Sequence, residues 1–155
     1  MAVSTKEVTG RRELHFDSYD QVLDDVHRLA EGGYRQLGNW SLGEICQHLA
    51  KSIDMAIDGS DAQFPWLLRK IAPLMKNRFL SRPIPSGYKI PPGANVEPDS
   101  AETAAGVAAI EKAVARLRET GDRRAHPLFG TLTRDQWDQF QLRHCELHLS
   151  FLVPE

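Results

Sequence analysis

Residues 131–152, TLTRDQWDQFQLRHCELHLSFL, contain a complete helix signal. Thr133 and Gln136 form a capping box, the pattern in which two free backbone N–H groups at a helix start find side-chain partners. Apolar and aromatic residues then recur at steps of three and four, the spacing of one helix face. This stripe runs through Trp137, Phe140, His144, His148 and Phe151. The sequence therefore predicts a helix that turns two imidazoles toward the core.

Residues 39–59, NWSLGEICQHLAKSIDMAIDG, predict a second helix of the same kind. Ser41 and Glu44 form another capping box, and Gly59 is suited to end the helix. The apolar stripe of this helix consists of Leu42, Ile45, Leu49, Ile53 and Ala56. His48 lies at the margin of that stripe, one residue before Leu49.

Three further segments show helix signals, namely residues 16–34, 64–80 and 99–121. Asp17 or Ser18 is the candidate cap of the first of these helices, and Asp99 or Ser100 that of the last. Pro73 falls inside the middle segment, where we expect it to break or kink the helix because it lacks a backbone N–H.

Residues 81–100, SRPIPSGYKIPPGANVEPDS, hold five prolines and two glycines, so we expect a loop rather than a helix or a central strand. No alternating strand pattern is visible. The predicted fold is all-α: a four-helix bundle with an extra helical segment and this loop, in one domain over residues 1–155. Long loops in small domains often cover sites. We therefore expect the loop to border the functional cavity with Tyr88 and Lys89 turned inward; the alternative is a plain connection between helices.

Composition excludes several function classes. The chain has 155 residues, 41% hydrophobic and 26% charged, with a net charge of −2. Without a basic excess, a dedicated binder of nucleic acid or of an anionic membrane is not expected. No apolar run approaches the length of a membrane span, and the first residues do not resemble a secretion signal. Two cysteines are too few for a disulfide framework, so we expect a cytoplasmic protein.

The two histidines of the last helix suggest a metal site. His144 and His148 are four residues apart, so their rings lie one above the other and can share one divalent ion. A third ligand must come from another element, and His48 is the best candidate. The alternative for each histidine is an ordinary core or half-exposed residue. Glu146, between the pair, is turned away from both and is expected on the surface.

The remaining reactive side chains have simpler interpretations. Glu44 is expected to close its capping box; the alternative is an acceptor for a ligand histidine or a base near the ion. Cys46 and Cys145 are expected to be reduced packing residues. Three other histidines without a partner pattern are read as structural or exposed: His15, His27 and His126.

Three segments of the chain resemble the DinB/YfiT-like superfamily of helical bundles, and more closely an uncharacterised branch of it. They are REL-HFDSYDQVLDDV, LGNWSLGEICQHLA and HPLFGTLTRDQWDQFQLRHCELHLSFL. The most specific features are Trp40–Ser41 leading to His48, and the terminal pair His144 and His148. The resemblance implies that these three histidines hold a divalent metal inside a bundle of up-down-down-up topology. Members with known activities include transferases and isomerases that use low-molecular-weight thiols.

Three functions are compatible with such a site. Neutral imidazoles leave the charge of a divalent ion uncompensated, so the ion favours an anionic fourth ligand such as hydroxide or thiolate. The candidates are a metal-dependent transferase that activates a low-molecular-weight thiol, a metal-dependent hydrolase, and a non-catalytic metal-binding or stress-associated module. Zinc, nickel and iron all suit three histidines. We expect a small-molecule substrate and leave a homodimer open. Side chains that could converge on the fourth position are Gln47, Tyr88, Gln141 and Arg143.

Overall fold

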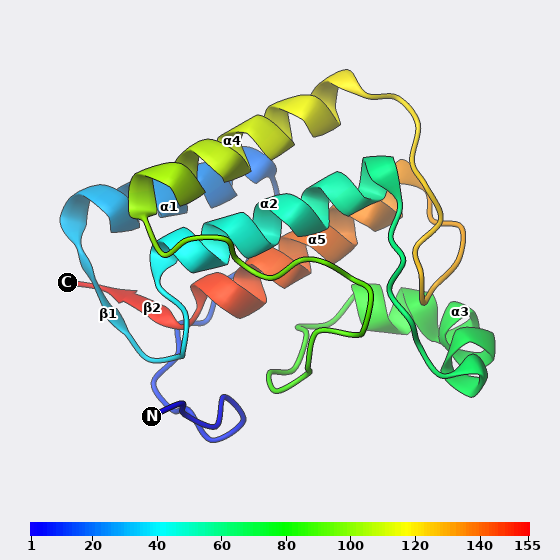
Figure 1. Cartoon of the computed structure of the whole chain (residues 1–155), viewed down its shortest axis with the longest axis horizontal. Helices are drawn as coiled ribbons and strands as arrows, with labels where there is room; N and C mark the ends of the chain where they lie inside the picture. Colours follow the sequence, from blue (N-terminus) through cyan, green and yellow to red (C-terminus); the bar gives the residue numbers. More distant parts are fainter.

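A computed structural model describes the whole chain, residues 1–155. It is mostly helical, with five helices and one two-stranded sheet (Figure 1). In chain order the elements are α1 (Tyr19–Gly32), β1 (Tyr34–Gln36), α2 (Leu42–Asp58), α3 (Trp66–Leu80), α4 (Thr103–Glu119), α5 (Arg134–Leu149) and β2 (Leu152–Pro154). None of the helices is both long enough and apolar enough to cross a membrane.

The core forms around α2, which packs along α4 and also contacts α1 and α5. Four of the five apolar residues on the predicted stripe of α2 are completely buried, namely Leu42, Leu49, Ile53 and Ala56. Helix α3 lies apart from this group (Figure 1) and makes its helix contacts with α5. The structure therefore places the His-bearing helices α2 and α5 together in the interior.

The predicted helix starts are largely confirmed. Ser18 caps α1, and the capping boxes of α2 and α5 both form, with Ser41 and Thr133 as caps. Helix α4 is an exception, since it begins at Thr103 rather than after Asp99 or Ser100. The reason is a tertiary contact: the backbone N–H groups of those two residues donate to the Gln47 side chain on α2.

Three other expectations need correction. Helix α3 continues through Pro73, so the expected break does not occur, while a kink at this residue stays a prediction. Helix α5 ends at Leu149, so Phe151 is buried beyond the helix rather than as part of its stripe. The segment after α5 forms β2, which pairs antiparallel with β1. Each strand has only three residues, too few to show an alternating pattern in the sequence.

Two glycines allow α2 and α4 to approach closely. A Cβ atom added at Gly106 would lie 2.4 Å from the carbonyl oxygen of Gly43, and one added at Gly43 would lie 2.5 Å from the carbonyl oxygen of Ala101. Both obstacles are backbone atoms, which cannot rotate away as a side chain can. The absence of side chains at these two positions therefore sets the spacing of the helices.

We predict that Gly106→Ala destabilises the fold by roughly 1–3 kcal/mol, because the added methyl group must push α4 away from α2. Gly32→Ala is the matched control, since a Cβ atom there meets nothing within 4 Å and the residue is helical. Alanine favours a helix over glycine, so the control should be neutral or stabilising by up to about 1 kcal/mol. Urea denaturation measures both changes, and equal stabilities of the two variants would contradict the close contact.

Candidate metal centre

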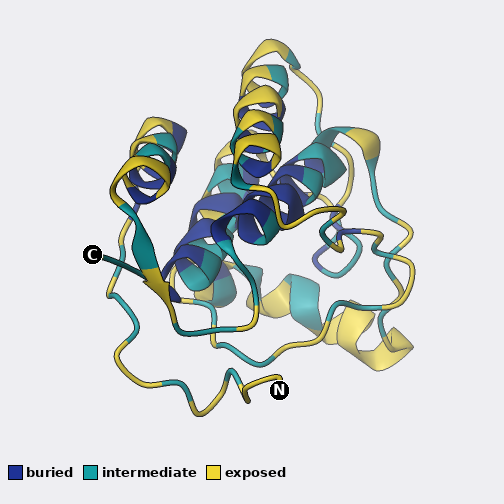
Figure 2. Ribbon diagram, turned by 60° about the vertical axis from the view of Figure 1, so that its left-hand side comes forward, coloured by how far each residue is buried: buried dark blue, intermediate teal, exposed yellow.

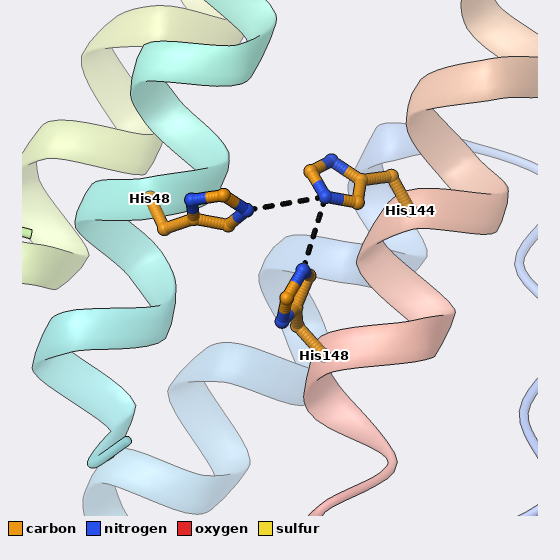
Figure 3. Close-up of side chains that lie close together, drawn as sticks. All are labelled: His48, His144 and His148. Carbon is orange, nitrogen blue, oxygen red and sulfur yellow. Dashed lines mark hydrogen bonds between the residues drawn. The ribbon is translucent and has the colours of Figure 1, made fainter. Parts of the chain in front are cut away.

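Three histidine rings converge between α2 and α5 (Figure 3). His48 comes from α2, and His144 and His148 come from successive turns of α5. The Nε2 atom of His144 lies 3.2 Å from Nε2 of His48 and 3.0 Å from Nε2 of His148. One ring nitrogen of each residue lies within 4.8 Å of the other two. The juxtaposition expected from the sequence is therefore present in the structure.

The backbone of the proline-rich loop orients His48. Its Nδ1 atom lies 2.8 Å from the carbonyl oxygen of Val96, a buried residue of that loop. A carbonyl oxygen can only accept a hydrogen bond, so Nδ1 must carry the proton and donate it. The Nε2 atom of a neutral His48 is then unprotonated, and its lone pair points toward the other two rings.

A chain of side chains orients His144 in the same way. Gln141 is completely buried and donates from Nε2 to the backbone carbonyl of Ser52, which turns its own Oε1 toward the Ser52 hydroxyl. The same hydroxyl lies 3.4 Å from Gln141 Oε1 and 3.2 Å from Nδ1 of His144; when its hydrogen is donated to Gln141, the hydroxyl is left to accept from Nδ1 of His144. In that tautomer His144 also presents an unprotonated Nε2 to the cluster.

With Nδ1 of both His48 and His144 protonated, the Nε2 lone pairs of these two rings face each other. His148 can donate a proton to Nε2 of His144 in that state, but none is left for the contact between His144 and His48. A cation among the rings would convert this repulsion into three attractive contacts. For metal–nitrogen bonds of about 2.0–2.1 Å, neighbouring nitrogens are roughly 2.8–3.4 Å apart at angles between 90° and tetrahedral. The separations of 3.0 and 3.2 Å from Nε2 of His144 to the other two Nε2 atoms fall in this range, and all three ligand nitrogens lie within 4.8 Å of one another.

Aromatic rings wall the cluster. Trp40 stacks on His148 at a centroid distance of 5.6 Å and also contacts His48, while Phe140 stacks on His144 at 5.8 Å. Burial disfavours the charged form and lowers the pKa of all three cluster histidines, His144 and His148 well below the ordinary value. The rings are therefore neutral near neutral pH, the form that binds metals.

Two predictions about charged residues of α5 are wrong. Glu146 is buried rather than exposed: its carboxylate pairs with Arg143 at 2.7 Å and accepts from the backbone N–H of Phe16. Arg143 also donates to the carbonyl oxygen of Phe16, so it does not line the fourth position of an ion. The reason is that the segment before α1 covers this side of α5, which the periodicity of a single helix cannot reveal.

The other candidates for the fourth position are also engaged elsewhere. Tyr88 is 72% exposed and Lys89 is exposed too, so neither turns inward as expected. Gln47 binds the backbone before α4, and Gln141 binds Ser52. The proline-rich loop does reach the cluster, but through the Val96 carbonyl, because an apolar side chain anchors better in the interior than a tyrosine or lysine.

Glu44 and the cysteines follow the simpler interpretations. The Glu44 carboxylate accepts from the backbone N–H of Ser41 and completes the capping box, while Val96 occupies the acceptor position beside His48. Cys46 and Cys145 are free thiols without solvent exposure. Burial raises the pKa of Cys46 to about 12 and raises that of Cys145 as well. Both are packing residues.

Sequence reasoning missed Ser52 and Val96 as partners of the cluster. A signal existed for Ser52, because it follows His48 by four residues and therefore lies on the same face of α2. No such signal existed for Val96. Every residue has a backbone carbonyl, and only the path of the loop brings that of Val96 to His48.

We predict that Ser52→Ala weakens zinc binding by roughly 10–100-fold, the usual effect of removing the partner of a ligand histidine. His144→Ala should abolish binding, because only two ligands remain. Glu44→Gln is the control and should bind zinc as the parent protein does, since its side chain is committed to the helix start. Titration calorimetry with zinc measures all three; a Ser52→Ala protein with parental affinity would contradict the orienting role of the hydroxyl.

Acid should destabilise the metal-free fold. Burial lowers the pKa of His126 to about 3, whereas an unfolded histidine titrates near 6.5. Between these values the unfolded chain binds a proton that folded His126 excludes, so the contribution of His126 to stability falls as pH falls below about 6.5 and is constant above it. The slope from His126 alone reaches about 1.4 kcal/mol per pH unit.

Urea denaturation in the presence of a chelator, at about pH 7 and about pH 5, tests this expectation. His126→Asn is the comparison, because an asparagine oxygen can still accept from the N–H groups of Leu128 and Phe129, as His126 Nδ1 does. The variant should show a shallower loss of stability in acid. An identical pH dependence of the two proteins would contradict the assignment of this loss of stability to His126.

Comparison with known proteins places the chain in a family. No curated protein and no solved structure gives a significant match. Residues 8–155 match the family described as "Protein of unknown function (DUF1569)". Because this match covers nearly the whole sequence, including all three cluster histidines, the chain belongs to the DUF1569 family.

Proposed function

We propose that this protein binds one divalent metal ion through Nε2 of His48, His144 and His148. The observation that carries the proposal is the convergence of these nitrogens while Nδ1 of both His48 and His144 is engaged by other groups. Interior histidines that served only for packing would have no reason to direct lone pairs at one another. Three neutral nitrogens suit zinc, nickel or iron(II).

The resemblance to DinB-like proteins supports the same assignment. In that interpretation α1, α2, α4 and α5 are the four helices of an up-down-down-up bundle, and α3 with the proline-rich loop is the insertion. The buried thiols of Cys46 and Cys145 suit a reducing cytoplasm.

We further propose that the activity is transfer of a low-molecular-weight thiol to an electrophilic small molecule. An ion held by neutral ligands favours a thiolate over a thiol in its coordination sphere, so it supplies the nucleophile. The chain's own part is to fix the three ligands and keep the rings neutral. No protein base is required, which agrees with the positions of Glu44 in its cap and of Glu146 in its pair with Arg143.

One observation favours a second function, a metal-binding module without turnover. The polar side chains considered for the fourth position are bonded elsewhere or exposed, and the rings beside the cluster are aromatic. A site without polar groups to orient a substrate fits storage or sensing of a metal better than catalysis.

Elemental analysis of the protein purified without an affinity tag or added metal tests the binding proposal. We expect about one equivalent of a transition metal in the parent protein and none in His144→Ala. A folded parent protein that neither retains metal nor binds added zinc, nickel or iron would refute the site.

Cobalt substitution then separates the functions. Thiol coordination should change the visible spectrum of the cobalt protein, and a panel of small thiols with an electrophilic acceptor should show turnover. If neither occurs, the non-catalytic module is the better assignment. If hydrolysis is found and Glu44→Gln removes it while metal stays bound, a hydrolase with a carboxylate base replaces the transferase.

A further inference from the structure

Helix α3 carries an apolar stripe that the protein leaves uncovered. Five apolar residues recur at the spacing of one helix face, a pattern typical of a helix that packs on a core. They are Leu67, Leu68, Ile71, Leu74 and Met75. In the structure these residues are 42–86% exposed, Leu74 the most. Trp66, at the start of the helix, is 68% exposed. Figure 2 shows α3 mainly in the colours of exposed and intermediate residues.

The opposite side of α3 is attached to the domain. Leu80 is 2% exposed, and Phe79 packs against Phe129 at a centroid distance of 5.2 Å. Lys76 donates to the backbone carbonyl of Thr131. These contacts fix which side of α3 faces the rest of the protein. The apolar stripe lies on the other side of the helix and is therefore exposed.

Charge is segregated around this helix. Residues 62–96 contain no aspartate or glutamate and six cations, Arg69, Lys70, Lys76, Arg78, Arg82 and Lys89. The rest of the chain therefore holds 13 basic residues against 21 acidic ones, which is why the net charge of −2 conceals the basic segment. Lys70 and Arg78 border the stripe directly, because each lies four residues from Leu74 on the same face.

We propose that α3 docks this protein on the surface of an anionic lipid bilayer. The stripe would enter the boundary between headgroups and acyl chains, with the helix lying in the plane of the membrane. Lys70 and Arg78 can extend their charged ends toward lipid phosphates while their methylene groups stay beside the stripe. Trp66 is suited to the interfacial region, where tryptophan is enriched in membrane proteins.

Charge selects this occupant over a second copy of the chain. Pairing two α3 helices along their stripes would bring the cations of both copies together, with no carboxylate in either segment to balance them. An anionic membrane supplies both the apolar layer and the negative charge that the segment lacks. The expectation of no membrane contact rested on the net charge of the whole chain. Net charge does not reveal that the basic residues around α3 are separated from the acidic residues of the rest of the chain.

Flotation with vesicles tests the proposal on the full-length protein. Vesicles of equal parts phosphatidylcholine and phosphatidylglycerol should carry the protein, and vesicles of phosphatidylcholine alone should not. Added salt should weaken binding, because the attraction is partly electrostatic. Trp66 is far more exposed than Trp40 or Trp137, so its emission should shift to the blue on binding, and a Trp66→Phe protein should lose that shift.

Two variants separate the contributions of charge and apolar surface. Lys70→Gln with Arg78→Gln should weaken vesicle binding roughly thirtyfold, from about 1 kcal/mol per cation. Its matched control is Arg35→Gln with Lys112→Gln, two exposed cations outside α3 without a side-chain partner, which should bind as the parent does. Ile71→Ser with Leu74→Ser should abolish binding while the melting temperature is kept, because both side chains are exposed.

The results that would overturn the proposal are equally specific. Binding that is the same with and without phosphatidylglycerol, or equally weakened by the control pair, would exclude recognition of anionic lipid by α3. A concentration-dependent dimer in sedimentation experiments that Ile71→Ser with Leu74→Ser dissolves, without vesicle binding by the parent, would assign the stripe to a second copy. None of these measurements depends on the metal site.

Discussion

The position of α2 is the constraint on which the rest of the structure depends. Gly43 and Gly106 let this helix lie directly against α4, backbone to backbone, so its rotation is restricted on that side. A helix fixed in rotation presents its remaining faces in fixed directions. His48 and Ser52, four residues apart on α2, therefore both meet α5, one as a member of the cluster and the other as the partner of His144. The close packing of α2 on α4 therefore also determines the geometry of the histidine cluster.

Neutral imidazoles in an interior are stable only if their polar atoms find partners. His48 and His144 each use Nδ1 for such a partner, a backbone carbonyl in one case and a buried hydroxyl in the other. Their Nε2 atoms are then left to face each other and Nε2 of His148 across the cluster. Three ring nitrogens gathered in this way form a group that could hold a metal ion, which packing alone does not require.

The helices and the histidine cluster could be predicted because both follow from local periodicity. Capping boxes at Ser41 and Thr133 depend on residues three apart, and the facing of His144 and His148 depends on residues four apart. The errors concern contacts between distant segments. Glu146 was expected on the surface, but residues before α1 cover it, and the acceptor beside His48 is a carbonyl from the loop. No spacing within one helix contains that information.

The proline-rich loop connects α3 with the cluster as well as with α4. One continuous segment runs from the exposed stripe of α3 through the prolines to Val96, whose carbonyl holds His48. Proline fixes φ and reduces the conformations available to the loop. At its other end Val96 is buried and cannot move without loosening the hydrogen bond to His48. The loop that follows the exposed helix α3 therefore also supplies the acceptor that fixes the tautomer of His48, and hence the direction of its Nε2 lone pair.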